Sequence, residues 1–315
     1  MPSNQTPLGA LPARFRRERV LIVGCGDVGL RAAALLRARV QVLALTSARE
    51  RDALLRQRGV RPLHGDLDRP ASLRRLAGLG TRVLHLAPPP GEGWVDTRTR
   101  ALAHVLRLRS APRALVYGST SGVYGDCAGA LVSETRATRA DTPRARRRVD
   151  AEARVRFFGR ASGARSSILR IPGIYAPDRD GCTPVGRLQK GTPVLRAQDD
   201  VYTNHIHADD LARACVKALW QGKAQRVYNV NDDTCLKMGD YFDLAADLYG
   251  LPRPPRVARG TAQRELPLLL LSFMSESRRM DNTRLKRELR LRLRYPTVEA
   301  GLVVSGVGRA RDDGR

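Results

Sequence analysis

Short apolar runs alternate with stretches of helical spacing along the first half of the chain. The apolar runs predict strands at 19–23, 40–45, 60–64, 82–86 and 114–117. The stretches between them predict helices at 28–39, 47–59, 70–76 and 97–109. Strands separated by about 10–15 helical residues need crossover connections, which produce a parallel sheet. The pattern therefore predicts an α/β fold with a Rossmann-type, doubly wound parallel sheet.

The second half of the chain is less regular. Residues 126–145 are polar, while a helix is predicted at 146–161, a sixth strand at 166–170 and further helices at 209–221, 239–249 and 282–288. We expect a Rossmann domain over 19–171 and a small C-terminal α+β substrate lobe over 172–300, with part of this segment rejoining the main sheet. We expect residues 1–18 to be a flexible leader and residues 301–315 a flexible tail.

A glycine-rich turn separates the first predicted strand from the first predicted helix. It consists of Gly24, Cys25, Gly26, Asp27, Val28 and Gly29. In Gly-x-Gly-x-x-Gly the first glycine permits a tight turn, the second lets the backbone approach a pyrophosphate, and the third lets the helix pack on the strand. The diphosphate would then lie over the free N–H groups at the helix N-terminus. The order of strand, turn and helix predicts that the chain binds a dinucleotide.

The cysteines and the lack of a long apolar run bear on the cellular compartment. The five cysteines lie far apart, without metal or disulfide spacing, and fit a reducing, cytoplasmic compartment. Cys25 lies near a helix N-terminus that would lower its thiol pKa, although a small side chain also simply fits the turn. No run of 18 apolar residues is present, so we expect no membrane partner.

The net charge of +25 at first suggests nucleic acid. Five of the 56 Lys and Arg residues are lysines, so 51 are arginines, a bias that arginine-rich codon usage also produces. The arginines are scattered and aromatic residues make up only 5% of the chain, so no stacking platform is evident. We expect no specific nucleic-acid partner.

Further segments extend the pattern beyond the glycine turn. They are 65–68 (GDLD), 117–125 (YGSTSGVYG), 169–175 (LRIPGIY), 204–211 (NHIHADDL), 228–232 (YNVND), 282–289 (NTRLKREL) and 295–297 (YPT). Over about residues 19–300 the chain resembles the extended short-chain dehydrogenase/reductase superfamily, also described as the NAD-dependent epimerase/dehydratase family. The resemblance implies an NAD(P) cofactor, a small-molecule substrate, an oxidoreductase or epimerase reaction, and a homodimer built on the helices after the fourth and fifth strands.

The resemblance also assigns roles to residues. Gly24, Gly26 and Gly29 would hold the pyrophosphate. The other implied cofactor contacts are Asp66 and Leu67 at the adenine, Ala87 and Pro88 along the groove, and Pro172, Gly173 and Ile174 at the nicotinamide. Thr120 falls where the family places the hydroxyl that binds the reacting oxygen of the substrate.

The end of the second strand bears on the choice of cofactor. NAD sites usually place an acid there to accept hydrogen bonds from the ribose. This chain has Thr46, Ser47 and Arg49, and no acid before Glu50. A hydroxyl and a guanidinium suit a 2′-phosphate, so we favour NADP over NAD.

The superfamily's reaction centre, Tyr-x-x-x-Lys, has no counterpart in this sequence. Aligned on Ala151-Glu152, its positions fall on Arg144 and Arg148, and none of the eight tyrosines has a lysine four residues later. Arginine stays protonated at neutral pH, so it cannot act as a general base, but it can bind anions or stabilise an oxyanion. Three interpretations follow: an atypical enzyme with reassigned acid/base groups, a dinucleotide-binding sensor or scaffold without turnover, or an enzyme for an anionic substrate.

Other polar residues have a functional and a structural interpretation. Tyr124 is the nearest substitute acid to Thr120, or else a packing residue. Thr120 itself binds substrate or caps the following loop. His205 and His207, with Asp209 and Asp210, suggest a metal site or proton relay, or else a helix cap with histidines packed between lobes. A third metal ligand at suitable spacing is lacking, so no metal is predicted.

Overall fold

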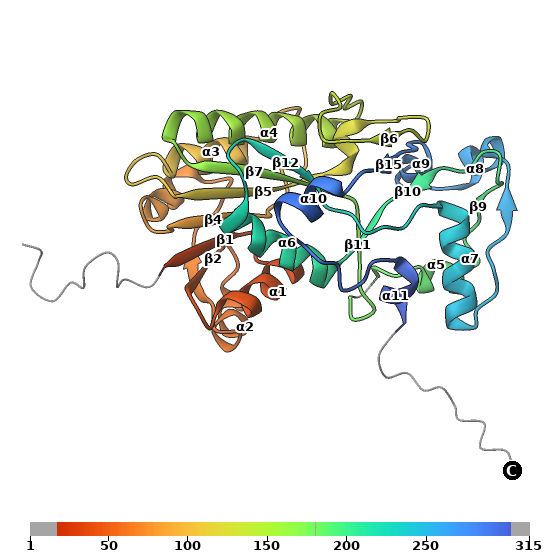
Figure 1. The fold of residues 1–315 in the computed structure, drawn as a ribbon, viewed down its shortest axis with the longest axis horizontal. Helices are drawn as coiled ribbons and strands as arrows, with labels where there is room; N and C mark the ends of the chain where they lie inside the picture. Colours follow the sequence, from red (N-terminus) through yellow and green to blue (C-terminus); the bar gives the residue numbers. More distant parts are fainter. Residues whose placement is uncertain (1–17, 180, 304–315) are drawn as a thin grey trace, which may run out of the picture.

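The computed structural model describes residues 18–179 and 181–303, so most of the predicted leader and tail lies outside the described residues. A seven-stranded parallel sheet in the order β12-β7-β5-β4-β1-β2-β3 forms its centre (Figure 1). The strands are β1 (Arg19–Val23), β2 (Gln41–Thr46), β3 (Arg61–His64), β4 (Arg82–His85), β5 (Ala114–Thr120), β7 (Arg165–Ile171) and β12 (Arg226–Asn229). The predicted Rossmann-type architecture is confirmed.

Helices cover both faces of this sheet. One face packs against α1 (Asp27–Leu36), α2 (Asp52–Gln57) and α6 (Ala208–Gln221), and the other against α3 (Thr97–Val105) and α4 (Pro143–Ser162) (Figure 1). Because both faces are buried, the central strands are continuous apolar runs rather than alternating ones. Residues 20–23 of β1, for example, are all completely buried.

The chain leaves the sheet after β7 and returns to it at β12. Between them, β8 (Gly173–Tyr175) pairs with β11 (His205–His207), which leads directly into α6. β12 then pairs with β7 in parallel and forms the edge of the sheet. Residues 208–229 therefore lie with the Rossmann layers, although they follow the expected domain boundary at residue 172.

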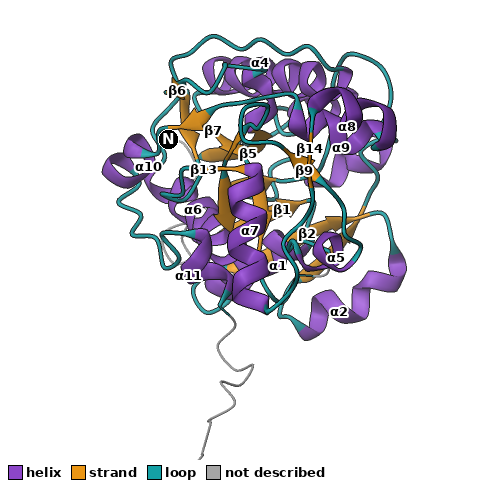
Figure 2. Ribbon diagram, turned by 90° about the vertical axis from the view of Figure 1, so that its right-hand side faces the viewer, coloured by secondary structure: helices purple, strands orange, loops and turns teal. Residues whose placement is uncertain are grey.

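A smaller lobe stands at one end of the sheet, on the right in Figure 1 and facing the viewer in Figure 2. Its helices are α5 (Val185–Gln189), α7 (Met238–Tyr249), α8 (Arg259–Glu265), α9 (Leu268–Met274) and α11 (Val298–Leu302). Its strand pairs are β9 (Val194–Leu195) with β14 (Arg256–Val257), and β10 (Tyr202–Thr203) with β13 (Leu236–Lys237). A separate apolar core, which includes Phe242 and Met274, holds the lobe together.

Some predicted boundaries shift. β5 and β7 run on to Thr120 and Ile171, because the two strands pair with each other over their whole length. Residues 47–59 and 70–76 contain 3₁₀ turns, η2 (Arg49–Arg51) and η3 (Pro70–Leu76). The polar segment after β5 contains η4 (Ser121–Tyr124) and β6 (Leu131–Val132), which pairs with β15 (Arg279–Met280) ahead of α10 (Thr283–Glu288). Within 18–179 and 181–303, no helix has both the length and the apolar character needed to cross a membrane.

Candidate functional site

The three glycines of the turn after β1 differ in the space that surrounds them. Gly24 has a φ of +86°, and a Cβ there would lie 2.3 Å from the backbone nitrogen of Ala87. At Gly29 a Cβ would lie 3.2 Å from the carbonyl oxygen of Gly24, so this glycine lets α1 pack closely on the turn. A Cβ at Gly26 would meet no atom within 4 Å. Two glycines are thus required by the fold, whereas Gly26 faces open space.

That open space lies at the amino end of α1. Gly26 is the N-cap residue, and no side chain caps the helix. Asp27 opens the helix, but its carboxylate pairs with Arg31 at 3.0 Å and Arg179 at 2.8 Å, which neutralise its charge. Val28 follows in the first turn. Uncapped N–H groups and a positive dipole end favour an anion here. These residues fit the diphosphate of a dinucleotide.

The loops after β3 and β4 are joined beside this turn. The Ala87 N–H donates to the Val23 carbonyl at 3.0 Å, which sets the β4 loop against the end of β1. Arg98 bridges the two loops, donating to the Pro88 carbonyl at 3.3 Å and to Asp68 at 2.6 Å. Asp66 and Leu67 lie on the β3 loop, where Ser72 accepts from the Asp66 N–H at 2.8 Å. The predicted adenine and groove positions thus share one connected edge.

The three residues predicted to lie beside the nicotinamide directly follow β7, which is separated from β1 by β5 and β4 in the sheet. Pro172 and Ile174 are half-buried, and Gly173 is exposed and donates to the Asn204 carbonyl at 3.2 Å. The Ile174 carbonyl accepts from Arg179 at 2.9 Å, and Arg179 also pairs with Asp27 of α1. This arginine ties the segment after β7 to the glycine-turn helix.

The segment after β2 contains a residue that sequence reasoning missed. Thr46 is buried, and its hydroxyl bonds within its own turn to Ala48. Ser47 and Arg49 are exposed. Arg51, two residues further on, is half-buried and donates to the Cys25 carbonyl at 2.7 Å. The structure therefore brings Arg51 to the glycine turn, and nothing in an arginine-rich sequence distinguished it from its neighbours.

The arginine run at the start of α4 divides by position. Arg144 is exposed. Arg147 donates to the Gly93 carbonyl at 2.6 Å, and the Arg146 guanidinium lies 4.9 Å from the centre of the Trp94 ring. Arg148 donates to the Tyr117 hydroxyl at 3.0 Å and to the Gly118 carbonyl at 2.7 Å. Arg148, at the position where the resemblance implies lysine, thus holds its guanidinium against Gly118 of β5, two residues before Thr120.

Thr120 and Tyr124 differ in accessibility. Thr120 is half-buried at the end of β5, and its hydroxyl accepts from the Gly122 N–H at 3.3 Å, which caps η4. Tyr124 is completely buried and donates to Asn229 at 2.6 Å, with the Arg170 guanidinium 4.6 Å from its ring centre. Burial raises the pKa of Tyr124. The packing interpretation of Tyr124 is favoured over a proton-donor role.

A model of the NAD dependent epimerase/dehydratase family matches residues 20–231. The chain belongs to this family. No curated protein sequence matches it significantly. Among solved structures, a functionally unknown conserved protein from Silicibacter pomeroyi is 30% identical with a TM-score of 0.77, over 90% of this chain and 96% of that one.

More distant relatives share the fold of this family member. UDP-glucose 4-epimerase from Thermotoga maritima is 18% identical with a TM-score of 0.73, over 90% of this chain and 96% of its own. UDP-glucuronic acid 4-epimerase from Bacillus cereus, solved with NAD, is 16% identical with a TM-score of 0.72 at the same coverages.

For two groups that the sequence singled out in this epimerase/dehydratase-family chain, the structure favours the packing interpretation over a reactive thiol or a metal site. The expectation of a lowered thiol pKa at Cys25 was wrong: burial raises it to about 11, outweighing the nearby Arg51 cation. His207, rather than Asp209, caps α6 by accepting from the Asp209 N–H at 3.2 Å.

The two histidines pack at the junction of the lobes. His205 stacks on Tyr241 with ring centres 4.2 Å apart, and His207 stacks on Tyr295 at 3.8 Å. Burial lowers the pKa of His205 to about 4. Within the described part of the chain no group of His, Cys, Asp or Glu has the geometry to hold a metal ion.

Proposed function

We propose that this protein is an NAD(P)-dependent oxidoreductase or epimerase-like enzyme of the extended short-chain type with an atypical reaction centre. The carrying observation is the glycine turn: Gly24 and Gly29 are held by close packing, while Gly26 leaves space at an uncapped helix end. A bound nicotinamide supplies hydride transfer, and the substrate carbon would be a carbonyl or hydroxyl carbon beside Thr120. The proton donor stays unassigned.

Arg148 supports an anionic substrate. Its guanidinium donates to the Tyr117 hydroxyl and the Gly118 carbonyl, and these two hydrogen bonds hold the side chain against β5. A guanidinium cannot exchange protons near neutral pH, but it can hold a carboxylate or stabilise an oxygen that gains charge. In this proposal Arg148 orients the substrate, and Thr120 donates a hydrogen bond to its reacting oxygen.

Arg51 supports NADP as the preferred cofactor. It is fixed against the glycine turn through the Cys25 carbonyl, and an NADP site needs a cation near the adenosine ribose. Within the described residues that carbonyl is the hydrogen-bond partner of the Arg51 side chain, so its other donors could form a fork for the 2′-phosphate. Ser47, exposed on the same segment, adds a hydroxyl donor.

One observation favours a second function, dinucleotide binding without turnover. The sequence lacks the Tyr-x-x-x-Lys pair, and the nearest substitute acid, Tyr124, is buried and bonded to Asn229. A protein of this kind would report redox state or serve as a scaffold. The two proposals agree on binding and differ on hydride consumption.

We further propose a homodimer that uses the outer face of α3 and α4. Phe157 of α4 is 58% exposed, and Leu108, in the turn that follows α3, is 52% exposed. Exposed apolar side chains that form a contiguous patch mark contact surfaces. We also propose a cytoplasmic location, since the five cysteines are free thiols.

Calorimetric titration with NADPH, NADP, NADH and NAD tests the dinucleotide site. We expect tight binding of a phosphorylated form, weakened at least about hundredfold by Gly26→Val, because the new side chain fills the space the phosphates need. Gly186→Val in α5 is the matched control, since a Cβ there also meets nothing within 4 Å. Moderate salt limits general attraction of polyanions to a protein with a net charge of +25.

The outcome also separates the two functions. Binding followed by NADPH oxidation in a screen of anionic carbonyl compounds supports the enzyme. Binding with neither net NADPH oxidation across that screen nor epimerisation of an anionic hydroxyl compound supports the sensor or scaffold. Absence of binding for all four nucleotides would overturn both.

A further inference from the structure

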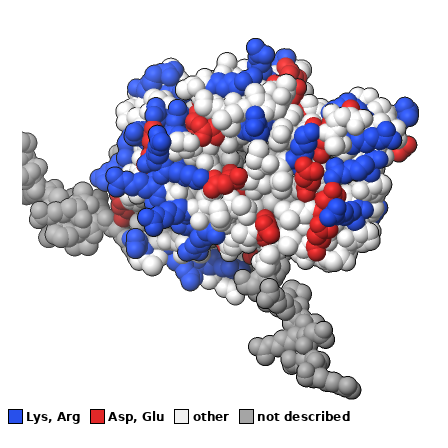
Figure 3. Space-filling model, turned by 45° about the vertical axis from the view of Figure 1, so that its right-hand side comes forward, with Lys and Arg blue, Asp and Glu red and all other residues white. Residues whose placement is uncertain are grey.

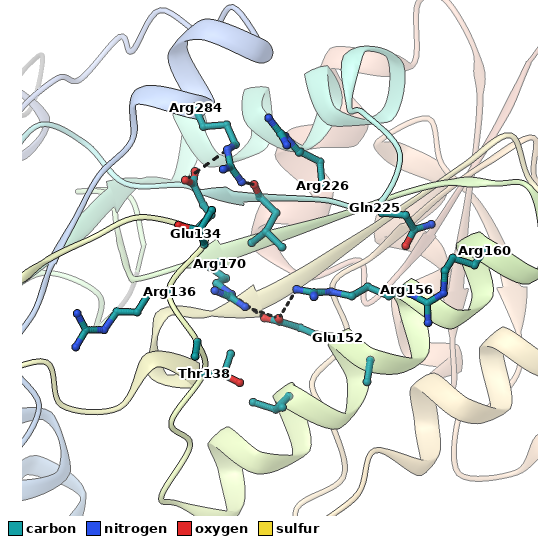
Figure 4. A pocket seen from close by; sticks show the side chains of 15 residues that line it. Glu134, Arg136, Thr138, Glu152, Arg156, Arg160, Arg170, Gln225, Arg226 and Arg284 are labelled. Carbon is teal, nitrogen blue, oxygen red and sulfur yellow. Dashed lines mark hydrogen bonds and ion pairs between the residues drawn. The ribbon is translucent and has the colours of Figure 1, made fainter.

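A cavity of about 700 Å³ opens on the edge of the sheet, away from the glycine turn. It lies between the second half of α4, strands β7 and β12, and the loop 134–138 (Figure 4). None of the residues assigned to the cofactor lines it. Its size falls within the range of about 300–1,000 Å³ for small-molecule sites. The cavity is therefore large enough for a small molecule and is separate from the predicted cofactor groove.

The lining of this cavity is strongly cationic. Its arginines are Arg136, Arg156, Arg160, Arg170, Arg226 and Arg284. They come from the 134–138 loop, α4, β7, β12 and α10, segments that meet only in the fold (Figure 4). Among the described lining residues Glu134 and Glu152 are acidic, and Arg226 pairs with Glu288 beside the lining, so six arginines face three carboxylates. On the face seen in Figure 3, Lys and Arg predominate on the left, and Asp and Glu lie among them mainly on the right.

The two glutamates are already engaged by the protein. Glu152 accepts from Arg170 at 2.8 and 3.1 Å and from the Ser119 hydroxyl at 2.7 Å. Glu134 accepts from the Asn229 N–H at 3.1 Å and lies 3.6 Å from Arg284. Their acceptor capacity therefore serves contacts within the protein, and among the described residues Arg136 and Arg160 pair with no carboxylate.

Buried donors in the cavity wall also lack acceptors. The Nε atom of Arg156 and the Nη1 atom of Arg170 are buried, and neither has a hydrogen-bond partner in the part of the chain that the structure describes. Arg156 extends across the cavity and forms an ion pair with Glu152 at 3.6 Å, which leaves its Nε atom without an acceptor among the described residues (Figure 4). Native proteins rarely leave charged donors in this condition, because each costs free energy unless an acceptor is supplied. An incoming anion would supply acceptors at Arg156.

We propose that this cavity binds a small phosphorylated anion, at a site separate from the dinucleotide groove. Planar guanidinium forks match pairs of phosphate oxygens, and several converging forks favour a multiply charged group over a single carboxylate. Arg156 and Arg170 form the inner wall, while the exposed Arg136 and Arg160 extend the cation cluster outward. Thr135, Thr138 and Gln225 add neutral hydrogen-bonding groups to the lining.

Calorimetric titration with inorganic pyrophosphate tests the site. Three proteins are compared: the unaltered chain, Arg136→Gln with Arg156→Gln, and Arg37→Gln with Arg39→Gln. The last pair is exposed just beyond α1 and removes the same charge without touching the cavity. We expect the cavity variant to lose at least about tenfold in affinity and the control less than about twofold.

Each alternative outcome has a clear meaning. Equal losses in both variants would show general attraction to a basic surface, and an unchanged cavity variant would place pyrophosphate elsewhere, the glycine turn included. Either result overturns the proposal. Citrate binding as tightly as pyrophosphate, with the same dependence on the cavity arginines, would overturn the preference for phosphate. A single-stranded oligonucleotide that competes with pyrophosphate only in the unaltered chain and the control would overturn the small-ligand assignment.

Folding of the cavity variant is checked by thermal melting. If its melting temperature falls, Arg136→Gln with Arg160→Gln replaces it, because both side chains are exposed and form no ion pair within the described residues. The same loss of pyrophosphate affinity is expected from that pair. Retained affinity in a folded variant overturns the site.

Discussion

The amino ends of α1 and α4, where the sequence resemblance leads us to expect the cofactor turn and the reaction centre, differ in kind. At α1 the sequence meets the geometric demands of a dinucleotide site through backbone: φ at Gly24, space at Gly26 and close packing at Gly29. At α4 the expected tyrosine and lysine positions hold Arg144 and Arg148. Binding that rests on backbone survives wide changes in side chains, whereas proton transfer depends on particular side chains. One function can therefore persist where the other is rebuilt or lost.

The largest effect is expected inside the glycine turn. Gly24→Ala forces a Cβ to within 2.3 Å of the Ala87 nitrogen at a φ of +86°, so we expect a loss of about 4 kcal/mol in the free energy of unfolding. Gly26→Ala, which meets no neighbour, should change the free energy of unfolding by less than about 1 kcal/mol. Urea denaturation of both variants measures the contrast, and similar losses would contradict the division of roles within the turn.

The sequence was informative where one local pattern carries the function and much less so where function depends on distant segments. Gly24, Gly26 and Gly29 lie in one turn, so their spacing alone predicted their arrangement. The arginine cavity depends on β12 pairing with β7 beside α4, which brings Gln225 and Arg226 next to the loop 134–138. Hydrophobic periodicity predicts strands but not their order in a sheet. Arg51 was missed for a related reason: its contact with Cys25 depends on how the segment after β2 turns back.

The second prediction concerns how α4 is anchored. Glu152 and Arg170 form a buried ion pair, 3% and 2% exposed, between α4 and β7. Glu152→Gln leaves Arg170 without its counter-charge, so we expect a loss of about 3 kcal/mol in unfolding free energy by urea denaturation. Asp141→Asn, exposed just before α4, is the control and should shift it by less than about 0.5 kcal/mol. Equal effects would mean that this pair does not fix α4 on the sheet.

A smaller effect separates the two arginines at the expected reaction centre. Arg148→Gln removes the donors to the Tyr117 hydroxyl and Gly118 carbonyl, which should lower unfolding free energy by about 1–2 kcal/mol. Arg144→Gln, at an exposed position, should lower it by less than about 0.5 kcal/mol. Urea unfolding curves of the two variants, compared with that of the unaltered chain, show whether the hydrogen bonds of Arg148 to β5 stabilise the fold. Indistinguishable curves would make both residues ordinary surface cations and remove the support for an anchored, substrate-orienting guanidinium.

The smallest expected effect is a change in cofactor affinity when arginines near the amino end of α1 are replaced. Arg51 contacts the Cys25 carbonyl at 2.7 Å, whereas Arg49 is exposed on the same segment. Arg51→Gln should weaken NADP binding about tenfold and NAD binding less than about twofold, since only NADP carries the 2′-phosphate that needs a cation. Arg49→Gln should leave both affinities within about twofold. A larger effect at Arg49, or equal losses for NADP and NAD at Arg51, would mean that Arg51 stabilises the loop rather than selecting the cofactor.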